Sequence, residues 1–354
     1  MFHPPRCPYR ACTFHRDPRP GAFRRHGQYH ALCRAHPVPR FRCSGCSRTF
    51  SRQTFRADYR DHRPDLNARL FQSLASGLGL RQTARNLGLS LRCCELKFRK
   101  IARHLRRLNL NLRGPLPERS SFQLDEFETF EARRNTRPLT MPVLIERDSR
   151  FIVWVESAPI RARGKMTPAR WRALEEDEKR FGRRRDASLW SLRRTLRRGS
   201  EMAGSLPRVF LETDKKTIYV RLAREAFGRD RLVHHTTSSR LPRTVFNPLF
   251  AINHTEAIAR DIMGRLRRRS WLVSKTRRYL DLALQLFASY RNYVRRRFNW
   301  DVCSPAQKLG FAPRRLTERE LLSWRQDWAR DSIHPLAREG ESVESWCPSS
   351  GSAA

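Results

Sequence analysis

The chain has 354 residues, with 73 Lys and Arg against 34 Asp and Glu, and its formal net charge is +39. Its length exceeds the usual size of one domain, about 100 to 200 residues, so two or three modules are expected. So high a positive charge favours a nucleic-acid partner, because basic side chains gain affinity by releasing the counterions condensed on phosphate. No stretch approaches the roughly 18 to 20 apolar residues of a membrane helix, and the first residues lack the apolar core of a signal peptide. We therefore expect an intracellular protein without membrane contact.

Residues 1–52 are predicted to form a zinc ribbon. They contain five of the nine cysteines of the chain and too few apolar residues to fold without a metal. Cys43 and Cys46 have the two-residue spacing that directs both thiolates at one tetrahedral ion, and Cys7 and Cys12 form a looser pair. These four cysteines are the expected zinc ligands. Three residues are alternatives to Cys12 in this set: Cys33, His15 and His36.

Residues 62–110 predict a helix-turn-helix domain that binds DNA. Leucines recur at helical spacing, glycines then interrupt the pattern, and a second helix contains Ala84, whose small side chain suits a helix crossing. Gly88 suits the turn, and the helix from about Ser90 would enter a major groove. The basic residues expected to contact DNA from this domain are Arg81, Arg92, Lys97, Arg99 and Lys100. A plain three-helix connector with a solvated charged face is the alternative.

Residues 120–300 are predicted to form the largest module of an α+β multidomain chain. Apolar and β-branched runs indicate three strands, of which the last two resemble a hairpin, and a helical insert follows at about 160–205. A strand, a helix, a further strand and two long helices complete the order. A C-terminal helical segment is expected at 301–334, and the polar composition of 335–354 predicts a disordered tail.

Two acidic residues occupy strand positions in this domain. Asp125 interrupts the apolar run of the first strand, and Asp214 closes the strand RVFLETD, with Glu212 pointing to the same sheet face. Such acids would meet on neighbouring strands. Carboxylates held close repel unless a cation lies between them, and their hard oxygens suit Mg²⁺ or Mn²⁺. A pair of such ions promotes phosphodiester displacement. Turn capping or pairing with arginine is the alternative for each acid.

The combined order of motifs resembles insertion-sequence transposases of the DDE type that carry a zinc ribbon, over roughly residues 5 to 325. The motifs are RFRCSGCSRTFS, the helix-turn-helix, LDEFETF, ETD after a strand, NHTEAIARDIMGRLRRRSWLVSK and the terminal SPAQKLGF. The resemblance implies that residues 120–300 form a ribonuclease H-like α/β catalytic domain, a mixed sheet with flanking helices. It also implies that Asp125 and Asp214 are the first two catalytic acids and magnesium ligands of this domain. It also implies double-stranded DNA, both element ends and target, as the partner of a homo-oligomer. The expected location is the cytoplasm, on the nucleoid.

The third acid departs from the family pattern. The position at which the family has a Glu corresponds to Asn253, which offers a metal a neutral oxygen and no charge. Glu256 lies one helical turn on and near the same face, so it could take the role. Asp261 lies two turns along. Arg260 and Arg267 on the same helix would contact backbone phosphate.

The resemblance therefore predicts a transposase that cuts element ends and joins them to target DNA by two-metal-ion hydrolysis and transesterification. A catalytically silent, zinc-containing DNA-binding regulator derived from such an enzyme is the alternative, and Asn253 favours it. Four tryptophans could stack on unpaired bases, with burial as the default: Trp271, Trp300, Trp324 and Trp328.

Overall fold

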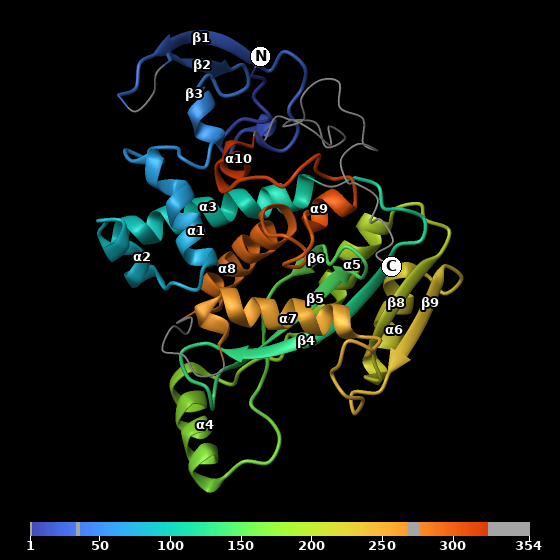
Figure 1. The fold of residues 1–354 in the computed structure, drawn as a ribbon. Helices are drawn as coiled ribbons and strands as arrows, with labels where there is room; N and C mark the ends of the chain where they lie inside the picture. Colours follow the sequence, from blue (N-terminus) through green and yellow to red (C-terminus); the bar gives the residue numbers. More distant parts are fainter. Residues whose placement is uncertain (1, 33–35, 113, 268–275, 325–354) are drawn as a thin grey trace.

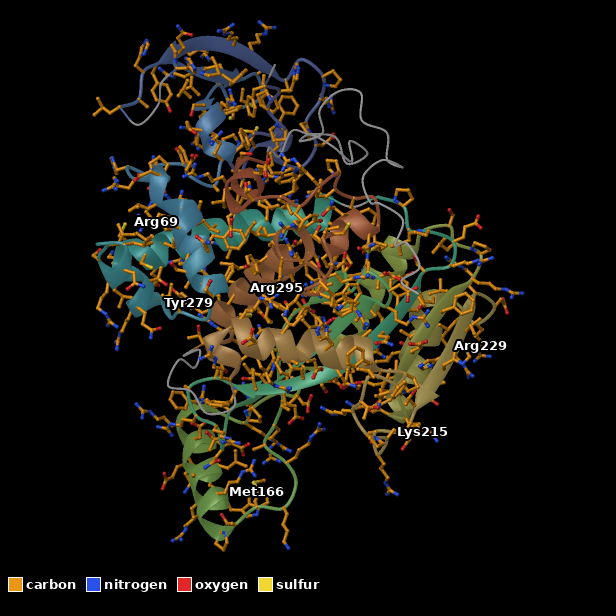
Figure 2. All side chains as sticks on the ribbon, viewed as in Figure 1. Arg69, Met166, Lys215, Arg229, Tyr279 and Arg295 are labelled. Carbon is orange, nitrogen blue, oxygen red and sulfur yellow. The ribbon has the colours of Figure 1, made fainter. Side chains whose placement is uncertain are left out.

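The computed structural model describes residues 2–32, 36–112, 114–267 and 276–324. In chain order the described residues form a small three-stranded sheet, three helices, and a six-stranded sheet flanked by helices (Figure 1). This is an α+β architecture. Its exposed basic side chains include Lys215 at the end of one strand and Arg229 before the next, on the right of Figure 2.

The N-terminal sheet has a very small apolar core. Its strands are antiparallel in the order β1 (Phe23–Tyr29), β2 (Val38–Cys43) and β3 (Thr49–Ser51). Phe41 lies opposite Phe50 across β2 and β3, and these rings pack with Phe55 and the cysteines Cys7 and Cys43. Two short 3₁₀ helices flank the sheet, at Thr13–His15 and Arg52–Phe55. Because so few apolar side chains are buried, the cysteines form a large share of this core.

Three helices are present where the sequence predicts them. After a 3₁₀ turn at Pro64–Leu66 they are α1 (Asn67–Ala75), α2 (Leu80–Asn86) and α3 (Leu91–Asn111). Ser90 caps α3, since its hydroxyl accepts a hydrogen bond from the Cys93 amide at 3.2 Å. Gly88 in the preceding turn has a φ of 62°, which favours glycine.

Helix α3 is fixed to the large domain by buried hydrogen bonds. Asn109 Nδ2 donates to the Gln285 carbonyl at 3.1 Å, and the Tyr293 hydroxyl donates to the Leu112 carbonyl at 2.6 Å. The apolar side chains of the three helices belong to the same core as those of the six-stranded sheet. The helical unit therefore has no separate hydrophobic core.

The large sheet is mixed. Its strands are β4 (Ser121–Phe130), β5 (Pro138–Glu146), β6 (Ile152–Val155), β7 (Ala158–Pro159), β8 (Val209–Asp214) and β9 (Leu232–Thr237). The order is β6-β5-β4-β8-β9, and β7 pairs with β5. Strand β5 is antiparallel to β4 and β6, whereas β4, β8 and β9 run parallel. This arrangement, with helices on its faces, is compatible with a ribonuclease H-like domain.

Two pairs of helices cover the two faces of the sheet. They are α7 (Phe250–Ile262) with α8 (Arg277–Ser289), and α5 (Ser188–Ala203) with α6 (Thr217–Phe227). On one face Val143 of β5 lines a small cavity with Ala259 and Phe287. On the other face a Cβ at Gly199 of α5 would lie 2.5 Å from Leu144, so only glycine allows this approach. Neighbouring strand residues point to opposite faces, which separates the two helix layers.

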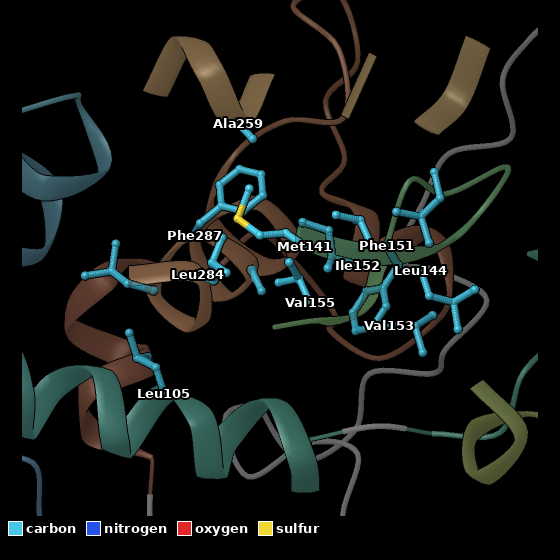
Figure 3. Close-up of a cluster of buried hydrophobic side chains, with 14 of the residues drawn as sticks. Leu105, Met141, Leu144, Phe151, Ile152, Val153, Val155, Ala259, Leu284 and Phe287 are labelled. Carbon is cyan, nitrogen blue, oxygen red and sulfur yellow. The ribbon is translucent and has the colours of Figure 1, made fainter. Parts of the chain in front are cut away.

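Side chains from two helices and the sheet meet in the core on the α8 side. Figure 3 shows Met141 and Val155 of the sheet close to Leu284 and Phe287 of α8, with Ala259 of α7 above them. All five side chains are at least nine-tenths buried. The core thus joins the sheet to the helix that covers it.

The expected insert at about 160–205 contains two α-helices, which differ in whether they pack on the sheet. Helix α5 packs on β5 and β6, whereas α4 (Pro168–Phe181) extends away from the sheet at the bottom of Figure 1. The two expected long helices are shorter than predicted: α7 is followed by a 3₁₀ turn at Gly264–Leu266, and α8 by a π-helical turn at Tyr290–Val294. The C-terminal segment contains α9 (Pro305–Lys308) and α10 (Glu318–Ser323). The predicted tail at 335–354 lies outside the described residues.

Candidate active site

Asp125 and Asp214 are neighbours on one face of the large sheet. Strands β4 and β8 run parallel with Leu124 opposite Thr213, so the residues that follow these two lie side by side. Glu126, the next residue, points to the opposite face, where its carboxylate accepts a hydrogen bond from the Tyr219 hydroxyl at 3.0 Å. The strand register therefore brings together the two acids that the sequence singled out.

A buried glutamine fixes α7 above these acids. Gln123 is completely buried on the same face as Asp125. Its Oε1 accepts a hydrogen bond from the Ile252 amide at 2.9 Å, and its Nε2 donates to the Pro248 carbonyl at 2.7 Å. These bonds set the position of the first turn of α7, from which Asn253 points into the cleft. Gln123 was not predicted as a site residue, although its spacing of two residues from Asp125 places both side chains on the same face of the strand.

The acids line one cleft of about 660 Å³. All four predicted catalytic residues contribute to its walls: Asp125, Asp214, Asn253 and Glu256. Five arginines also line it: Arg134, Arg170, Arg243, Arg260 and Arg267. The cleft thus combines carboxylates with guanidinium groups, and this combination suits a phosphate backbone held against bound cations.

The carboxylates in the cleft repel one another. Burial, and next the charge of Asp125, raise the pKa of Glu256 to about 7. Burial is also the largest cause that raises the pKa of Asp125 to about 6, and the charge of Asp214 contributes. The guanidinium of Arg243 acts in the opposite direction on both groups. A cluster of buried acids whose charges disfavour each other is a fitting environment for a divalent cation.

Glu256 has an oxygen available to such an ion. The side chain is 5 % exposed, and no described residue donates a hydrogen bond to its Oε1. Its Oε2 lies 3.9 Å from Arg260 Nη2. Buried carboxylate oxygens are normally hydrogen-bonded, so the orphaned Oε1 fits a metal ligand. Asp261 is exposed and is not among the described residues that line the cleft.

The N-terminal cysteines form a tighter group than the acids. Among the described residues, Cys7, Cys12, Cys43 and Cys46 are the one set of three or more potential ligands whose donor atoms all lie within 4.8 Å of one another. Two Sγ to Sγ distances, Cys7 to Cys46 and Cys12 to Cys43, are 3.7 Å. Thiolates about 2.3 Å from a tetrahedral zinc ion are separated by about 3.8 Å. The arrangement is compatible with a structural zinc site.

The three alternatives to Cys12 do not belong to this described group. His15 is engaged elsewhere, since its Nδ1 lies 2.7 Å from the Cys7 carbonyl oxygen. His36 is exposed, and Cys33 lies outside the described residues. Gly45 between the second pair of cysteines is closely packed, because a Cβ there would lie 2.9 Å from the Phe14 ring.

Of the basic residues expected to contact DNA from the helical unit, Lys97 has another role. Its ammonium group donates to Asp61 Oδ1 at 2.5 Å, to the Arg63 carbonyl at 2.7 Å and to Asn67 Oδ1 at 3.0 Å. These bonds use all three N–H donors of a lysine. The side chain is 4 % exposed, so Lys97 holds α3 against the segment before α1 and presents no charge to solvent.

The other predicted basic contacts differ in their exposure. Arg81 and Arg92 are exposed at the start of α2 and α3, and Arg99 is half-buried. Lys100 donates to the Tyr59 carbonyl at 2.5 Å. In the cleft, the Arg260 guanidinium lies 4.4 Å from the centre of the Phe127 ring, and the Arg267 guanidinium donates to the Asp261 carbonyl at 3.1 Å.

Two of the four tryptophans that were considered for stacking on unpaired bases lie in the described part of the chain. Trp324 is buried and packs against His104, whereas Trp300 is 77 % exposed. Trp271 and Trp328 lie outside the described residues, as does Lys275, the last residue of the motif NHTEAIARDIMGRLRRRSWLVSK.

Comparison of the chain with models of known protein families and with curated protein sequences gives no match. None of the helices in the described ranges has both the length and the apolar character needed to cross a membrane.

Proposed function

We propose that the chain is a DNA transposase of the DDE type, which cuts the ends of an insertion sequence and joins them to target DNA. The observation that supports this most is the convergence of Asp125, Asp214 and Glu256 on one cleft walled by arginines. The order of the mixed sheet is compatible with a ribonuclease H-like domain, which supports the proposal. The family resemblance supplies the reaction class.

Asp125, Asp214 and Glu256 would hold Mg²⁺ or Mn²⁺, with Asn253 as a neutral neighbour. When bound, such ions activate the attacking hydroxyl and stabilise the leaving oxygen. The three carboxylates come from β4, β8 and α7. Glu256 therefore supplies the charge that Asn253 lacks, from one helical turn further along.

The arginines of the cleft position the DNA in this proposal. Arg243, Arg260 and Arg267 would contact backbone phosphates, since guanidinium groups bind phosphate oxygens in pairs of hydrogen bonds. A water oxygen attacks phosphorus and the bond to the 3′-oxygen of the element breaks. The freed 3′-hydroxyl then attacks a target phosphate and displaces its bridging oxygen.

The N-terminal modules complete the proposal. The cysteine cluster binds a structural Zn²⁺, and the helical unit binds element ends as a helix-turn-helix through Arg81 and Arg92. Double-stranded element ends and target DNA are the partners. A homo-oligomer is required because two ends must be joined.

Purified protein, given DNA that carries the gene's own flanking ends and either Mg²⁺ or Mn²⁺, tests the activity. We expect wild type to cut and join at an element end, and Asp125→Asn and Glu256→Gln to lose cutting at least about a hundredfold. Asn253→Ala should retain it. Glu128→Gln is the matched control, because Glu128 lines the same cleft but is exposed. If Glu256→Gln still cuts DNA and Asn253→Ala does not, Asn253 is the third metal ligand instead of Glu256.

A catalytically silent DNA-binding regulator is the second candidate, and Asn253 at the position of the third acid favours it. Such a protein would bind the same ends tightly and leave them uncut under either metal. That result would overturn the transposase proposal.

A further inference from the structure

Four aromatic rings form a continuous stack beside the cleft. Phe250 and His254 come from α7, and Phe298 and Trp300 follow the π-helical turn. The ring centres are 5.7 Å apart from Phe250 to His254, 5.2 Å from His254 to Phe298 and 5.0 Å from Phe298 to Trp300. The last two rings are nearly parallel, with 8° between their planes. Trp300 ends the stack and is 77 % exposed, so one face of its indole is covered by Phe298 and the other faces solvent.

Arginine side chains line this stack. The Arg150 guanidinium lies 5.4 Å from the centre of the Phe250 ring and 5.5 Å from that of Phe298, and Arg297 lies 5.1 Å from Phe298. Arg297 is paired with Asp301 at 2.7 Å. The Nε and Nη1 groups of Arg150 are buried, and no described residue accepts a hydrogen bond from them.

The backbone also marks Arg150. Its φ of 66° is in the left-handed region, which a side chain larger than glycine rarely adopts. Arg150 ends the turn between β5 and β6, where its amide donates to the Glu146 carbonyl at 3.0 Å, and its side chain holds a cation with spare donors against two rings of the stack. The stack is therefore positively charged as well as aromatic.

The stack and the cleft lie on adjacent faces of one helix. Asn253 lines the cleft and His254 belongs to the stack, so the two side chains are about 100° apart around α7. The first two rings of the stack thus come from the helix whose neighbouring face lines the cleft.

We propose that Trp300, supported by Phe298 and flanked by arginines, is a stacking platform for an unpaired base of single-stranded DNA. An unpaired base offers a flat surface to the indole and a phosphate to the guanidinium groups. A second copy of this chain is a poorer occupant, because the chain has a formal net charge of +39 and would bring a like charge. The inference rests on the proposed function in one respect, that DNA is the partner. It does not require that the chain cuts DNA.

The test compares two oligonucleotides of about 12 residues, one of thymidines and one of abasic sugars with the same number of phosphates. Affinities of the full chain are measured by fluorescence anisotropy at one fixed salt concentration without added divalent metal, so that neither probe is cut. Wild type should bind the thymidine oligonucleotide about tenfold more tightly than the abasic one. Trp300→Ala should abolish this preference and leave affinity for the abasic oligonucleotide unchanged, and Trp300→Phe should restore most of it.

Trp190→Ala is the matched control, since Trp190 is 52 % exposed on α5 and lies outside the stack. It should keep the full preference for bases. An unchanged preference in Trp300→Ala would overturn the inference. So would a change of oligomeric state in Trp300→Ala, measured by light scattering, with DNA affinity unaltered, because the indole would then belong to a protein interface. Loss of cutting in the variants of the catalytic acids bears on the proposed function alone.

Discussion

Gln123 and Ile252, from the central strand and the helix that covers it, are joined by a hydrogen bond of 2.9 Å between the Gln123 Oε1 and the Ile252 amide. The same side chain donates to the carbonyl of Pro248 and to the carboxylate of Glu212. One buried residue thus links β4, β8 and the start of α7. These are the three elements that supply the acids of the cleft.

Replacing Gln123 by Leu should therefore affect both stability and the site. The Ile252 amide would lose its partner in the interior, which costs about 1 to 3 kcal/mol of the free energy of unfolding. We also expect DNA cutting to fall more than DNA binding, because α7 would no longer be held in register with β4. Urea denaturation and cleavage assays measure the two effects. Equal losses of binding and cutting would show that Gln123 has no specific role in the site.

Lys97→Ala should destabilise the helical unit. Both partners of the Lys97 to Asp61 ion pair are buried, and removal of one partner of a buried ion pair costs about 3 to 5 kcal/mol. Arg92→Ala, an exposed change in the same helix, should leave thermal stability nearly unaltered and weaken DNA binding. Thermal unfolding followed by circular dichroism compares them. If the Lys97→Ala protein is stable and binds DNA more weakly, Lys97 contacts DNA as the sequence predicts.

Metal analysis of the purified chain should give one Zn²⁺ per molecule. Cys12→Ser and Cys43→Ser should each lose most of it, because three thiolates bind zinc more weakly than four. Cys93→Ser serves as the control, since Cys93 lies in α3 away from the cluster. If Cys12→Ser keeps its full zinc content, a residue other than Cys12 is the fourth zinc ligand.

His104 should make stability depend on pH in the acidic range. Burial lowers the pKa of His104 to about 4 from an ordinary value of 6.5, while its Nε2 lies 3.0 Å from the Leu321 carbonyl oxygen. Between these values the unfolded chain binds more protons than the folded one. The free energy of unfolding is therefore unaffected by His104 above about pH 6.5. As the pH falls below that value, protonation of His104 in the unfolded chain lowers the free energy of unfolding, by about 3 kcal/mol at pH 4.

Urea denaturation of wild type and His104→Gln at several pH values checks this. The difference in free energy of unfolding between the two proteins should shrink on acidification in that range. A constant difference would show that the pKa of His104 is the same in the folded protein as in the unfolded chain. The comparison removes the contributions of other titrating groups, because they are shared.

The strands of the large domain were predictable from local pattern. The run from Ser121 to Phe130 and the hairpin that follows are made of apolar and β-branched residues bounded by turn signals, and they form β4, β5 and β6 as expected. The spacing of Cys43 and Cys46 likewise predicts a shared ligand site, since two residues on one tight turn cannot be far apart. Each of these inferences depends on residues close together in the chain.

Contacts between distant segments decide what local pattern leaves open. Glu256 and Asp261 both follow Asn253 on one helix, yet the rotation of α7 against the sheet buries Glu256 in the cleft and leaves Asp261 exposed. The sequence indicates that Lys97 is a surface charge, whereas in the structure it is buried in an ion pair with Asp61. Side-chain type and spacing determine which faces and turns can form, whereas the orientation of one element on another follows from packing and buried hydrogen bonds between parts far apart in the chain.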